Sequence, residues 1–206
     1  MALARKTLGI RKNPKEKARR EQIKHAAIKL FSVSGYNQVS LDDLALEAGV
    51  SKALFYWYWE SKAALLTDLI DLCMSPYLDL LKAAVDSEAP YMEKMQHLLL
   101  KSLNLLRENE NLNKVVHFCS LHIGKKPEEN FGPQVDRHYE KCMKFLEILF
   151  QEGIAQGLIK KNMDVAAMSL ETMCFIEGYI YMTILGNRMP FHHVLLPIFN
   201  AFIFED

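Results

Sequence analysis

Residues 52–58 carry, within seven positions, a Lys ammonium group and two Tyr hydroxyls beside an indole ring. If this segment is helical, Phe55 and Trp59 lie four residues apart and can face inward together. The other side chains then surround the rest of the helix: Lys52, Ala53, Leu54, Tyr56, Trp57 and Tyr58. Hydroxyl and ammonium groups bind phosphate, and apolar groups contact base edges such as the thymine methyl. This pattern therefore predicts a helix that recognises DNA.

The preceding residues are suited to hold such a helix in place. Ser40 can cap a helix, and apolar residues then recur at helical spacing, at Leu41, Leu44, Ala45 and Ala48. Gly49 suits the left-handed turn that ends this helix, and Ser51 can cap the next one. Residues 39–62 therefore predict a helix-turn-helix, whose second helix enters the DNA major groove.

These residues resemble the tetracycline-repressor (TetR) family of bacterial transcription regulators. The resemblance rests on four motifs that occur in order: Gly35-Tyr36, Ala48-Gly49-Val50-Ser51, Lys52-Ala53-Leu54-Phe55-Tyr56-Trp57-Tyr58-Trp59 and Ser61-Lys62. It is dense from residue 18 to residue 66 and continues as a looser helical resemblance to the C-terminus. It implies an all-α fold of about nine helices, in which an N-terminal three-helix DNA-binding domain precedes an all-helical ligand-binding and dimerisation domain. Leu54 and Trp57 differ from the residue types most frequent in the family, so they bear on which bases are recognised.

The distribution of charge agrees with a DNA-binding head. The net charge of the chain is zero, but residues 1–62 contain 12 Lys and Arg against 6 Asp and Glu. We expect a disordered basic arm over residues 1–14, a helix-turn-helix domain over 15–62 and a helical ligand-binding and dimerisation domain over 63–206. The sequence shows neither a signal peptide nor an uninterrupted apolar span, so we expect a cytoplasmic protein without membrane contact.

The second domain has the composition of a ligand pocket. Helical periodicity continues through it, with an end or a kink of the fourth helix predicted at Pro76 and a last helix over residues 190–204. Apolar walls with a few polar groups suit a hydrophobic small molecule. The residues that we predict to line a pocket are Met95, Leu99, His117, Phe118, Cys119, His122, Met143, Phe175, Glu177, Tyr179 and Met182. The alternative is that Met and Phe at this spacing form an ordinary core.

The last two predicted helices are apolar on more than one side, and a helix of this kind is buried on two sides. One side can face the domain core and the other a partner subunit. In the TetR family the last two helices pair with their two-fold mates, which implies a homodimer that binds double-stranded DNA at a two-fold operator. The residues that we predict at the dimer interface are Met168, Phe175, Ile176, Tyr179, Val194, Leu195, Ile198, Phe199 and Phe202.

His117, Cys119 and His122 are the residues best suited to bind a metal ion. Residues two apart do not share a helix face, so the three side chains do not readily meet one ion. Gly-rich phosphate loops, nucleophile elbows and paired-carboxylate spacings do not occur in the sequence. We therefore predict that the protein is not an enzyme and has neither a metal site nor a cofactor.

These observations predict a homodimeric transcription regulator, a repressor that a small apolar or amphipathic ligand releases from its operator. The residues assigned to DNA binding are Ser40, Ser51, Lys52, Ala53, Leu54, Tyr56, Trp57, Tyr58 and Lys62. Within this set, the residues expected to face bases are Lys52, Ala53, Leu54 and Trp57, and those expected to position phosphates are Ser40, Tyr56, Tyr58 and Lys62. Two alternatives are a DNA-binding scaffold without ligand control and a metal- or redox-sensing regulator that uses Cys119.

Overall fold

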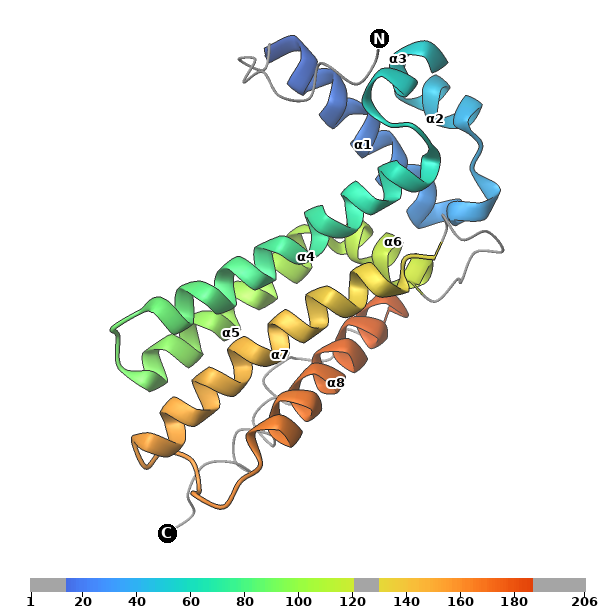
Figure 1. Cartoon of the computed structure of the whole chain (residues 1–206). Coiled ribbons are helices and arrows are strands. Elements are labelled where there is room, and N and C mark those ends of the chain that lie inside the picture. The colour runs from blue at the N-terminus through green and yellow to red at the C-terminus, as the bar shows by residue number, and fades with distance from the viewer. Residues whose placement is uncertain (1–13, 121–129, 187–206) are drawn as a thin grey trace. The chain divides into compact units, whose positions relative to one another are not determined.

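The structure is a computed structural model that describes residues 14–120 and 130–186. Within these ranges the chain is helical and has no β-strand, so the predicted all-α class is confirmed (Figure 1). The elements are α1 (Pro14–Ser34), the 3-10 helix η2 (Tyr36–Gln38), α2 (Leu41–Glu47), α3 (Lys52–Tyr58), α4 (Lys62–Asp86), α5 (Tyr91–Glu108), α6 (Glu110–Ser120), α7 (Gly132–Ala155) and α8 (Val165–Ile184). The chain divides into two compact units between Leu65 and Leu66.

The N-terminal unit has a small core to which each of its helices contributes. On α1, Ile23 and Phe31 are at most 2% exposed. α2 adds Leu44 and α3 adds Phe55, which are 0% and 1% exposed. α1 packs against α2, and α2 packs against α3. Because a shared core buries one face of each helix, it fixes the orientation of α3 on its support.

A tight turn joins α2 to α3, as the sequence predicts. Gly49 has a φ of 59°, in the left-handed region that favours glycine. The Val50 N–H donates to the Ala45 carbonyl at 2.9 Å, which closes the end of α2. The predicted helix-turn-helix is therefore present.

α4 is one continuous helix of 25 residues, although Pro76 lies inside it. Of the two predicted effects of Pro76, an end of the helix is therefore wrong. Pro has no N–H, so the carbonyl of Leu72 loses its helical donor. Leu72 is 39% exposed, which allows water to reach that carbonyl. Cys73 before Pro76 and Leu81 after it are both buried, so packing on both sides holds the helix together.

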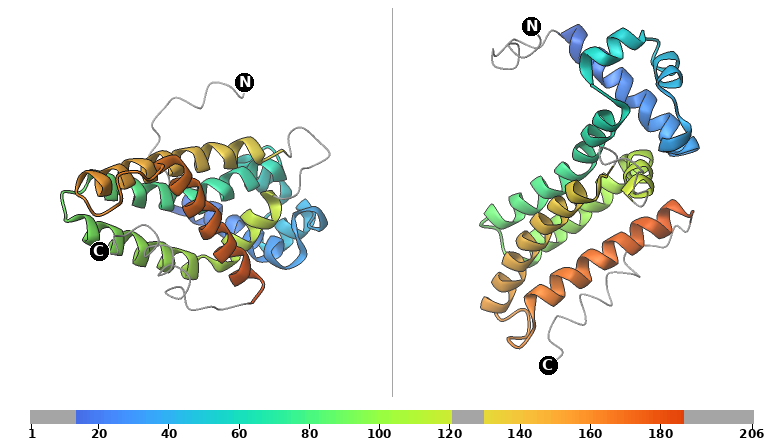
Figure 2. Two further views of the ribbon diagram at one scale, coloured as in Figure 1. Left: turned by 90° about the horizontal axis from the view of Figure 1, so that it is seen from below. Right: turned by 45° about the vertical axis from the view of Figure 1, so that its right-hand side comes forward.

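The C-terminal unit builds its main core around α7, which packs along α8 (Figure 2). Leu149 is fully buried in this core, and Leu146 is nearly so. α7 is closely packed at Gly153, where a Cβ would lie 2.7 Å from Ile159 Cδ1 and 2.8 Å from Tyr91 Cζ. Contacts this short are not found for real Cβ atoms, so a larger residue here would force the buried Ile159 or Tyr91 side chain to shift.

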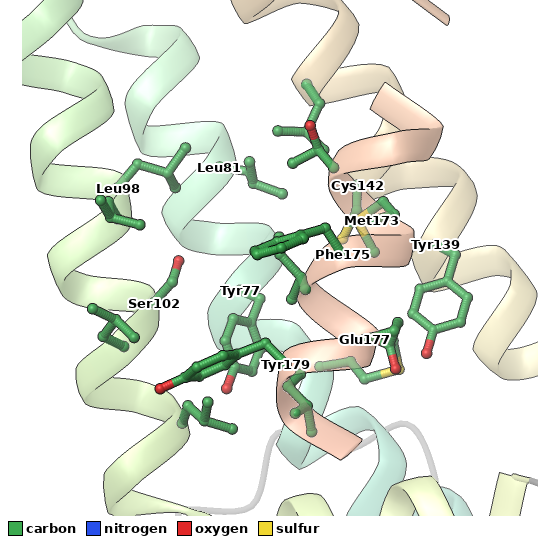
Figure 3. Close-up of a pocket in the computed structure, with 18 of the residues that line it drawn as sticks. Tyr77, Leu81, Leu98, Ser102, Tyr139, Cys142, Met173, Phe175, Glu177 and Tyr179 are labelled. Carbon is green, nitrogen blue, oxygen red and sulfur yellow. The ribbon is translucent and has the colours of Figure 1, made fainter. Parts of the chain in front are cut away.

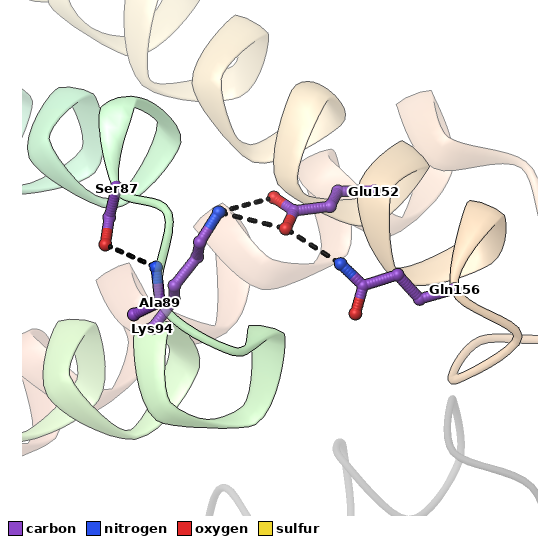
Figure 4. A network of polar contacts seen from close by, with 5 residues as sticks. All are labelled: Ser87, Ala89, Lys94, Glu152 and Gln156. Atoms are coloured by element: carbon purple, nitrogen blue, oxygen red, sulfur yellow. Dashed lines mark hydrogen bonds and ion pairs between the residues drawn. The ribbon is translucent and has the colours of Figure 1, made fainter.

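A buried ion pair joins α5 to α7 (Figure 4). Lys94 Nζ lies 2.9 Å and 3.0 Å from the two carboxylate oxygens of Glu152. Gln156 Nε2 donates to the same carboxylate at 3.0 Å. The Lys94 side chain is only 5% exposed, so its charge depends on this partner. In the turn before α5, the Ala89 N–H donates to Ser87 Oγ at 3.1 Å.

Two predicted segments fall largely or wholly outside the described residues. These are the basic arm over residues 1–14, of which only Pro14 is described, and the last helix over 190–204. Among the helices that the structure does describe, none is long and apolar enough to cross a membrane.

Candidate DNA-binding surface and ligand cavity

α3 is held by two buried aromatic side chains. Phe55 is 1% exposed and Trp59 is 4% exposed, and their ring centroids lie 5.9 Å apart. The Arg20 guanidinium lies 5.3 Å from the Trp59 ring centroid, so α1 supports the pair from the other side. The prediction that Phe55 and Trp59 face inward is confirmed.

The opposite face of α3 presents aromatic rings to solvent. Tyr56 is 52% exposed and Trp57 is 64% exposed. Lys52 and Ala53 are also exposed, and Leu54 is half-buried. Exposed side chains of this size do not stabilise a small domain, so their arrangement favours contact with a partner.

Lys52 forms an ion pair with Asp42 at the start of α2. The distance from Lys52 Nζ to Asp42 Oδ1 is 2.7 Å, and both side chains are more than half exposed. The hydrogen bond to Asp42 raises the pKa of Lys52, so the ammonium keeps its charge. Lys52, which we predict to contact DNA, is therefore paired with the Asp42 carboxylate in the free protein.

Ser40 and Ser51 act as helix caps. Ser40 Oγ accepts from the Asp43 N–H at 3.1 Å, and Asp43 Oδ2 accepts from the Ser40 N–H at 2.8 Å. Hydrogen bonds from Ser40 lower the pKa of Asp43, which keeps this carboxylate charged. Ser51 Oγ accepts from the Leu54 N–H at 3.2 Å. These hydroxyls thus set where α2 and α3 begin.

Lys62 and Tyr58 are directed into the N-terminal unit. Lys62 Nζ donates to the main-chain carbonyls of Tyr36 at 2.7 Å and Val39 at 2.8 Å. Tyr58 Oη donates to the Glu16 carbonyl at 3.2 Å. Lys62 and Tyr58, which we predict to position phosphates, thus bond the protein's own backbone in the free protein.

The C-terminal unit contains a cavity of about 170 Å³, whose wall comes from α4, α5, α6, α7 and α8 and is almost entirely apolar (Figure 3). Part of the predicted pocket set lines it, namely Met95, Leu99, His117, Phe175, Glu177 and Tyr179. The prediction fails for Phe118, Met143 and Met182, which lie outside the wall. Phe118 and Met182 are 39% and 37% exposed, and Cys142 takes the inward position next to Met143 on α7. The Cys119 side chain and His122 lie outside the described residues.

Several lining residues were not in the predicted set. Cys73 and Tyr77 come from α4, Asn113 from α6, and Tyr139 and Cys142 from α7. Tyr77 directly follows Pro76, where a break was expected, and a continuous helix is what places it beside Cys73. The i, i+4 spacing of Cys73 and Tyr77 is the sequence signal that could have identified this side of the cavity.

A polar cluster lies at one part of the cavity wall. His117 Nε2 lies 2.8 Å from Glu177 Oε2, and His117 Nδ1 lies 2.8 Å from the Asn113 carbonyl oxygen. Because a carbonyl only accepts, Nδ1 carries a proton. Burial lowers the pKa of His117, but the hydrogen bond and charge of Glu177 raise it further, so the net shift is upward. This geometry holds an imidazolium against a carboxylate.

The remaining titratable groups of the wall stay neutral. Burial raises the pKa of Cys73 to about 12 and of Cys142 to about 11. Burial also raises the pKa of Tyr77 and Tyr139, and at Tyr139 the nearby Glu177 carboxylate adds to the effect. Figure 3 shows the Tyr139 hydroxyl directed toward Glu177. The cavity therefore offers hydroxyl and thiol groups, but no thiolate or phenolate.

Four of the residues predicted at the dimer interface lie on α8, where the structure places them toward their own unit. Met168 is 1% exposed and belongs to the core of its own unit. Phe175, Ile176 and Tyr179 line the cavity. The other face of α8 carries an exposed stripe, formed by Leu170, Cys174, Gly178, Tyr181 and Leu185. Apolar residues surround the whole helix, so periodicity could not separate the inner face from the outer one. Val194, Leu195, Ile198, Phe199 and Phe202 lie outside the described residues.

Comparison with known proteins identifies the N-terminal unit. Residues 23–69 match the bacterial regulatory proteins of the tetR family. The fatty acid metabolism regulator protein of Bacillus subtilis (strain 168) is 26% identical over 144 residues, which cover 70% of this chain and 72% of that protein. The nucleoid occlusion factor SlmA of Haemophilus influenzae (strain PittGG) is 28% identical over 162 residues, which cover 77% and 72%.

Solved structures show the same fold over almost the whole chain. NalD, the secondary repressor of the MexAB-OprM multidrug efflux pump in Pseudomonas aeruginosa, has a TM-score of 0.77 at 20% identity and covers 94% of this chain and 100% of its own. SmeT in complex with triclosan has a TM-score of 0.72 at 16% identity, with coverages of 91% and 93%. The helix-turn-helix and these relatives agree with the resemblance in residues 18–66, and the chain is a DNA-binding transcription regulator whose N-terminal unit belongs to the TetR family.

Proposed function

We propose that this regulator is a homodimeric repressor, which a small apolar or amphipathic ligand releases from a two-fold operator. It acts in the cytoplasm, where its DNA target lies, and it regulates rather than catalyses. Three features of the chain support this proposal: the outer face of α3, the exposed stripe of α8 and the cavity.

The outer face of α3 is the observation on which the proposal depends. Tyr56 and Trp57 are exposed next to each other on a helix that Phe55 and Trp59 hold from behind. Lys52, Ala53, Leu54 and Trp57 face bases in this proposal, and Tyr56 bonds a phosphate. Ser40, Ser51, Tyr58 and Lys62 then contribute indirectly, because they fix the positions of α2, α3 and α4.

The exposed stripe of α8 supports a dimer. Leu170 is 54% exposed, Tyr181 is 46% exposed and Leu185 is 56% exposed, and these residues recur on one face of the helix. A second copy of the same stripe would cover this apolar face about a two-fold axis. Two α3 helices would then meet half-sites one DNA turn apart, roughly 34–36 Å.

The cavity supports control by a ligand. α4 begins at Lys62 in the N-terminal unit and contributes Cys73 and Tyr77 to the cavity wall. Asp71 of the same helix accepts hydrogen bonds from Gln134 at 2.8 Å and from His138 at 2.9 Å, which tie α4 to α7. A ligand that fits only one arrangement of α4 would shift the population toward dimers that do not match the operator.

The first test is DNA binding by the purified full-length protein. Fluorescence anisotropy with DNA from upstream of its own gene, at two salt concentrations and with a random duplex as control, measures affinity and specificity. We expect saturable binding that is tighter than to the random duplex and weakens as salt rises. Absence of binding at both salt concentrations would contradict the role of α3.

The relationship to SlmA favours one second candidate. A nucleoid occlusion factor that is 28% identical shows that relatives of this chain include proteins named for a role other than repression. Under this alternative the chain is a DNA-binding scaffold without ligand control. It would occupy many chromosomal sites, and no compound would change its affinity for them.

A further inference from the structure

We infer that the cavity takes an uncharged molecule of about one aromatic ring, bearing a hydroxyl or carbonyl group that hydrogen-bonds to Tyr77. This inference rests on the proposed function, because it names the chemical class of the effector. It follows from three observations, which concern the charge of the wall, a buried hydroxyl and the volume.

The first observation is that the wall has no charge to offer a ligand. Among the described residues that line the cavity, none is Lys or Arg. His117 and Glu177 are the groups that carry charge, and they lie 2.8 Å apart as an ion pair. A ligand carboxylate would therefore lack a cation, and a ligand ammonium would have to compete with His117 for Glu177. Burying a charge without a partner is strongly unfavourable, so an uncharged ligand is favoured.

The second observation is the hydroxyl of Tyr77. It is buried, it belongs to a side chain of the cavity wall, and no polar atom of the described residues meets hydrogen-bond geometry with it. The Asn113 side chain, which also lines the cavity, acts on this hydroxyl and lowers the pKa that burial raises. Ser102 of α5 and Tyr179 of α8 line the cavity too, and Figure 3 draws them with Tyr77. Buried polar groups in folded proteins are nearly always bonded. Because a hydroxyl can donate and accept, a ligand hydroxyl can donate to Tyr77, and a ligand carbonyl can take the place of Asn113 as acceptor.

The third observation is the size and lining of the cavity. Its volume is about 170 Å³, and an apolar cavity of about 150 Å³ in another protein holds one benzene molecule. Tyr91, Phe150 and Phe175 place aromatic rings in the wall, which favours ring-to-ring contacts with the ligand. One substituted ring fits this space, whereas a long acyl chain requires the helices to separate.

The test uses four compounds with the same ring and ethyl group: 4-ethylphenol, 4-ethylbenzoate, 4-ethylbenzylammonium and 4-ethyltoluene. Isothermal titration calorimetry with the full-length protein at pH 7.5 measures each affinity without DNA. We expect 4-ethylphenol to bind at least about tenfold more tightly than the benzoate and the ammonium compound. Tighter binding of either charged compound, or no binding by any of the four, would overturn the inference.

A pair of variants tests the role of Tyr77. Tyr77→Phe should weaken binding of 4-ethylphenol by between about twofold and tenfold and leave that of 4-ethyltoluene unchanged, because only the hydrogen bond is removed. Ser34→Ala is the control, since it removes an exposed hydroxyl at the end of α1, away from the cavity wall and the α8 stripe, and should change neither affinity. An equal loss for both compounds in Tyr77→Phe would mean that the variant has altered the cavity rather than a hydrogen bond.

The same compounds separate this inference from the proposed function. If 4-ethylphenol binds with the expected preference but does not weaken operator binding in the anisotropy assay, the inference holds and ligand-controlled release fails. If a charged compound binds most tightly and does release the operator, release holds and the inferred ligand class is wrong.

Discussion

The ammonium group of Lys62 lies 2.7 Å from the main-chain carbonyl oxygen of Tyr36 and 4.1 Å from the centroid of the Tyr36 ring. It also donates to the Val39 carbonyl at 2.8 Å. Both carbonyls belong to the segment that leads into α2, so Lys62 ties the start of α4 to the helix-turn-helix. Lys62 therefore stabilises the N-terminal unit that presents α3, although lysine is also a residue type that attracts phosphates.

Replacing Lys62 by Met should lower the free energy of unfolding by about 1–3 kcal/mol, because hydrogen bonds from a charged donor and a cation–π contact are lost. Urea denaturation followed by circular dichroism measures this change. Lys82→Met is the matched control in the same helix, since Lys82 is 63% exposed and its ion pair with Asp86 is on the surface. If Lys62→Met instead makes the salt dependence of DNA binding less steep by about 0.9, Lys62 does contact a phosphate.

Trp57→Ala should change which base is preferred at one operator position and leave stability almost unchanged. Trp57 is 64% exposed, and exposed substitutions alter the free energy of unfolding by about 0.5 kcal/mol or less. A lost base contact alters discrimination by about 1–3 kcal/mol. Titration against all single-base variants of the operator measures the preference.

Leu46→Ala, which truncates a side chain that is 83% exposed on α2, should preserve the base preference of the wild type. Identical base preferences in wild type and Trp57→Ala would remove Trp57 from the recognition set.

The stabilisation that comes from the His117–Glu177 pair should decrease as pH rises from 6 to 9. The pKa of His117 is raised in the folded protein, so its contribution is fully present below the unfolded pKa. It is lost as pH rises through the higher folded pKa. Wild type should therefore exceed His117→Gln in free energy of unfolding by a larger margin at pH 6 than at pH 9.

Urea denaturation at both pH values measures the margin for His117→Gln. Gln96→Ala serves as the control, because Gln96 lies exposed on α5 and does not titrate, so it should give the same difference at both pH values. A margin for His117→Gln that grows with pH would contradict an imidazolium at this position.

The ion pair between Lys94 and Glu152 should respond unequally to loss of each partner. Glu152→Ala should destabilise by about 3 kcal/mol or more, because it leaves the Lys94 ammonium, 5% exposed, without its anion. Lys94→Met should cost less, since Glu152 is 26% exposed and keeps its hydrogen bond from Gln156. Thermal or urea unfolding of both variants measures the two losses of stability. A larger loss in Lys94→Met would mean that leaving the Glu152 carboxylate unpaired costs more than leaving the Lys94 ammonium unpaired.

Two identical substitutions should have opposite effects on stability. Gly153→Ala should lower the free energy of unfolding by about 1–3 kcal/mol, because its Cβ would lie 2.7 Å from Ile159 Cδ1. Gly178→Ala should raise it by about 0.5–1 kcal/mol in the monomer, because a Cβ at this helical position meets nothing within 4 Å of the same chain. The comparison is made at a protein concentration at which the chain is monomeric, since Gly178 lies on the stripe that a second copy would cover. Equal destabilisation in both variants would show that crowding against Ile159 does not cause the loss of stability in Gly153→Ala.

The helix-turn-helix was predictable from the sequence because its determinants are local. The caps Ser40 and Ser51 and the turn at Gly49 lie next to the helices that they end or begin, and the inward pair Phe55 and Trp59 follows from their spacing. None of these features depends on residues far along the chain.

The cavity was only partly predictable because its wall comes from five helices. Pro76 suggested a break, and packing on both sides of it keeps α4 continuous and brings Tyr77 to the wall. Along α7, a shift of one residue separates Cys142, which lines the cavity, from Met143, which does not. The inward role of Lys62 could not be predicted, because the carbonyls that it bonds are 23 and 26 residues away.

The ion pair between Lys52 and Asp42 bears on how the protein searches the chromosome. In the proposed function Lys52 faces bases, so a base acceptor that it binds must displace a carboxylate that already lies 2.7 Å from its Nζ. At a site without such an acceptor Lys52 stays paired with Asp42 and adds little to the attraction for the DNA backbone, whereas contacts between Trp57 and bases are unaffected. We therefore expect Asp42 to shorten each visit to an incorrect site, so that an acidic residue beside the recognition helix speeds the search for the operator.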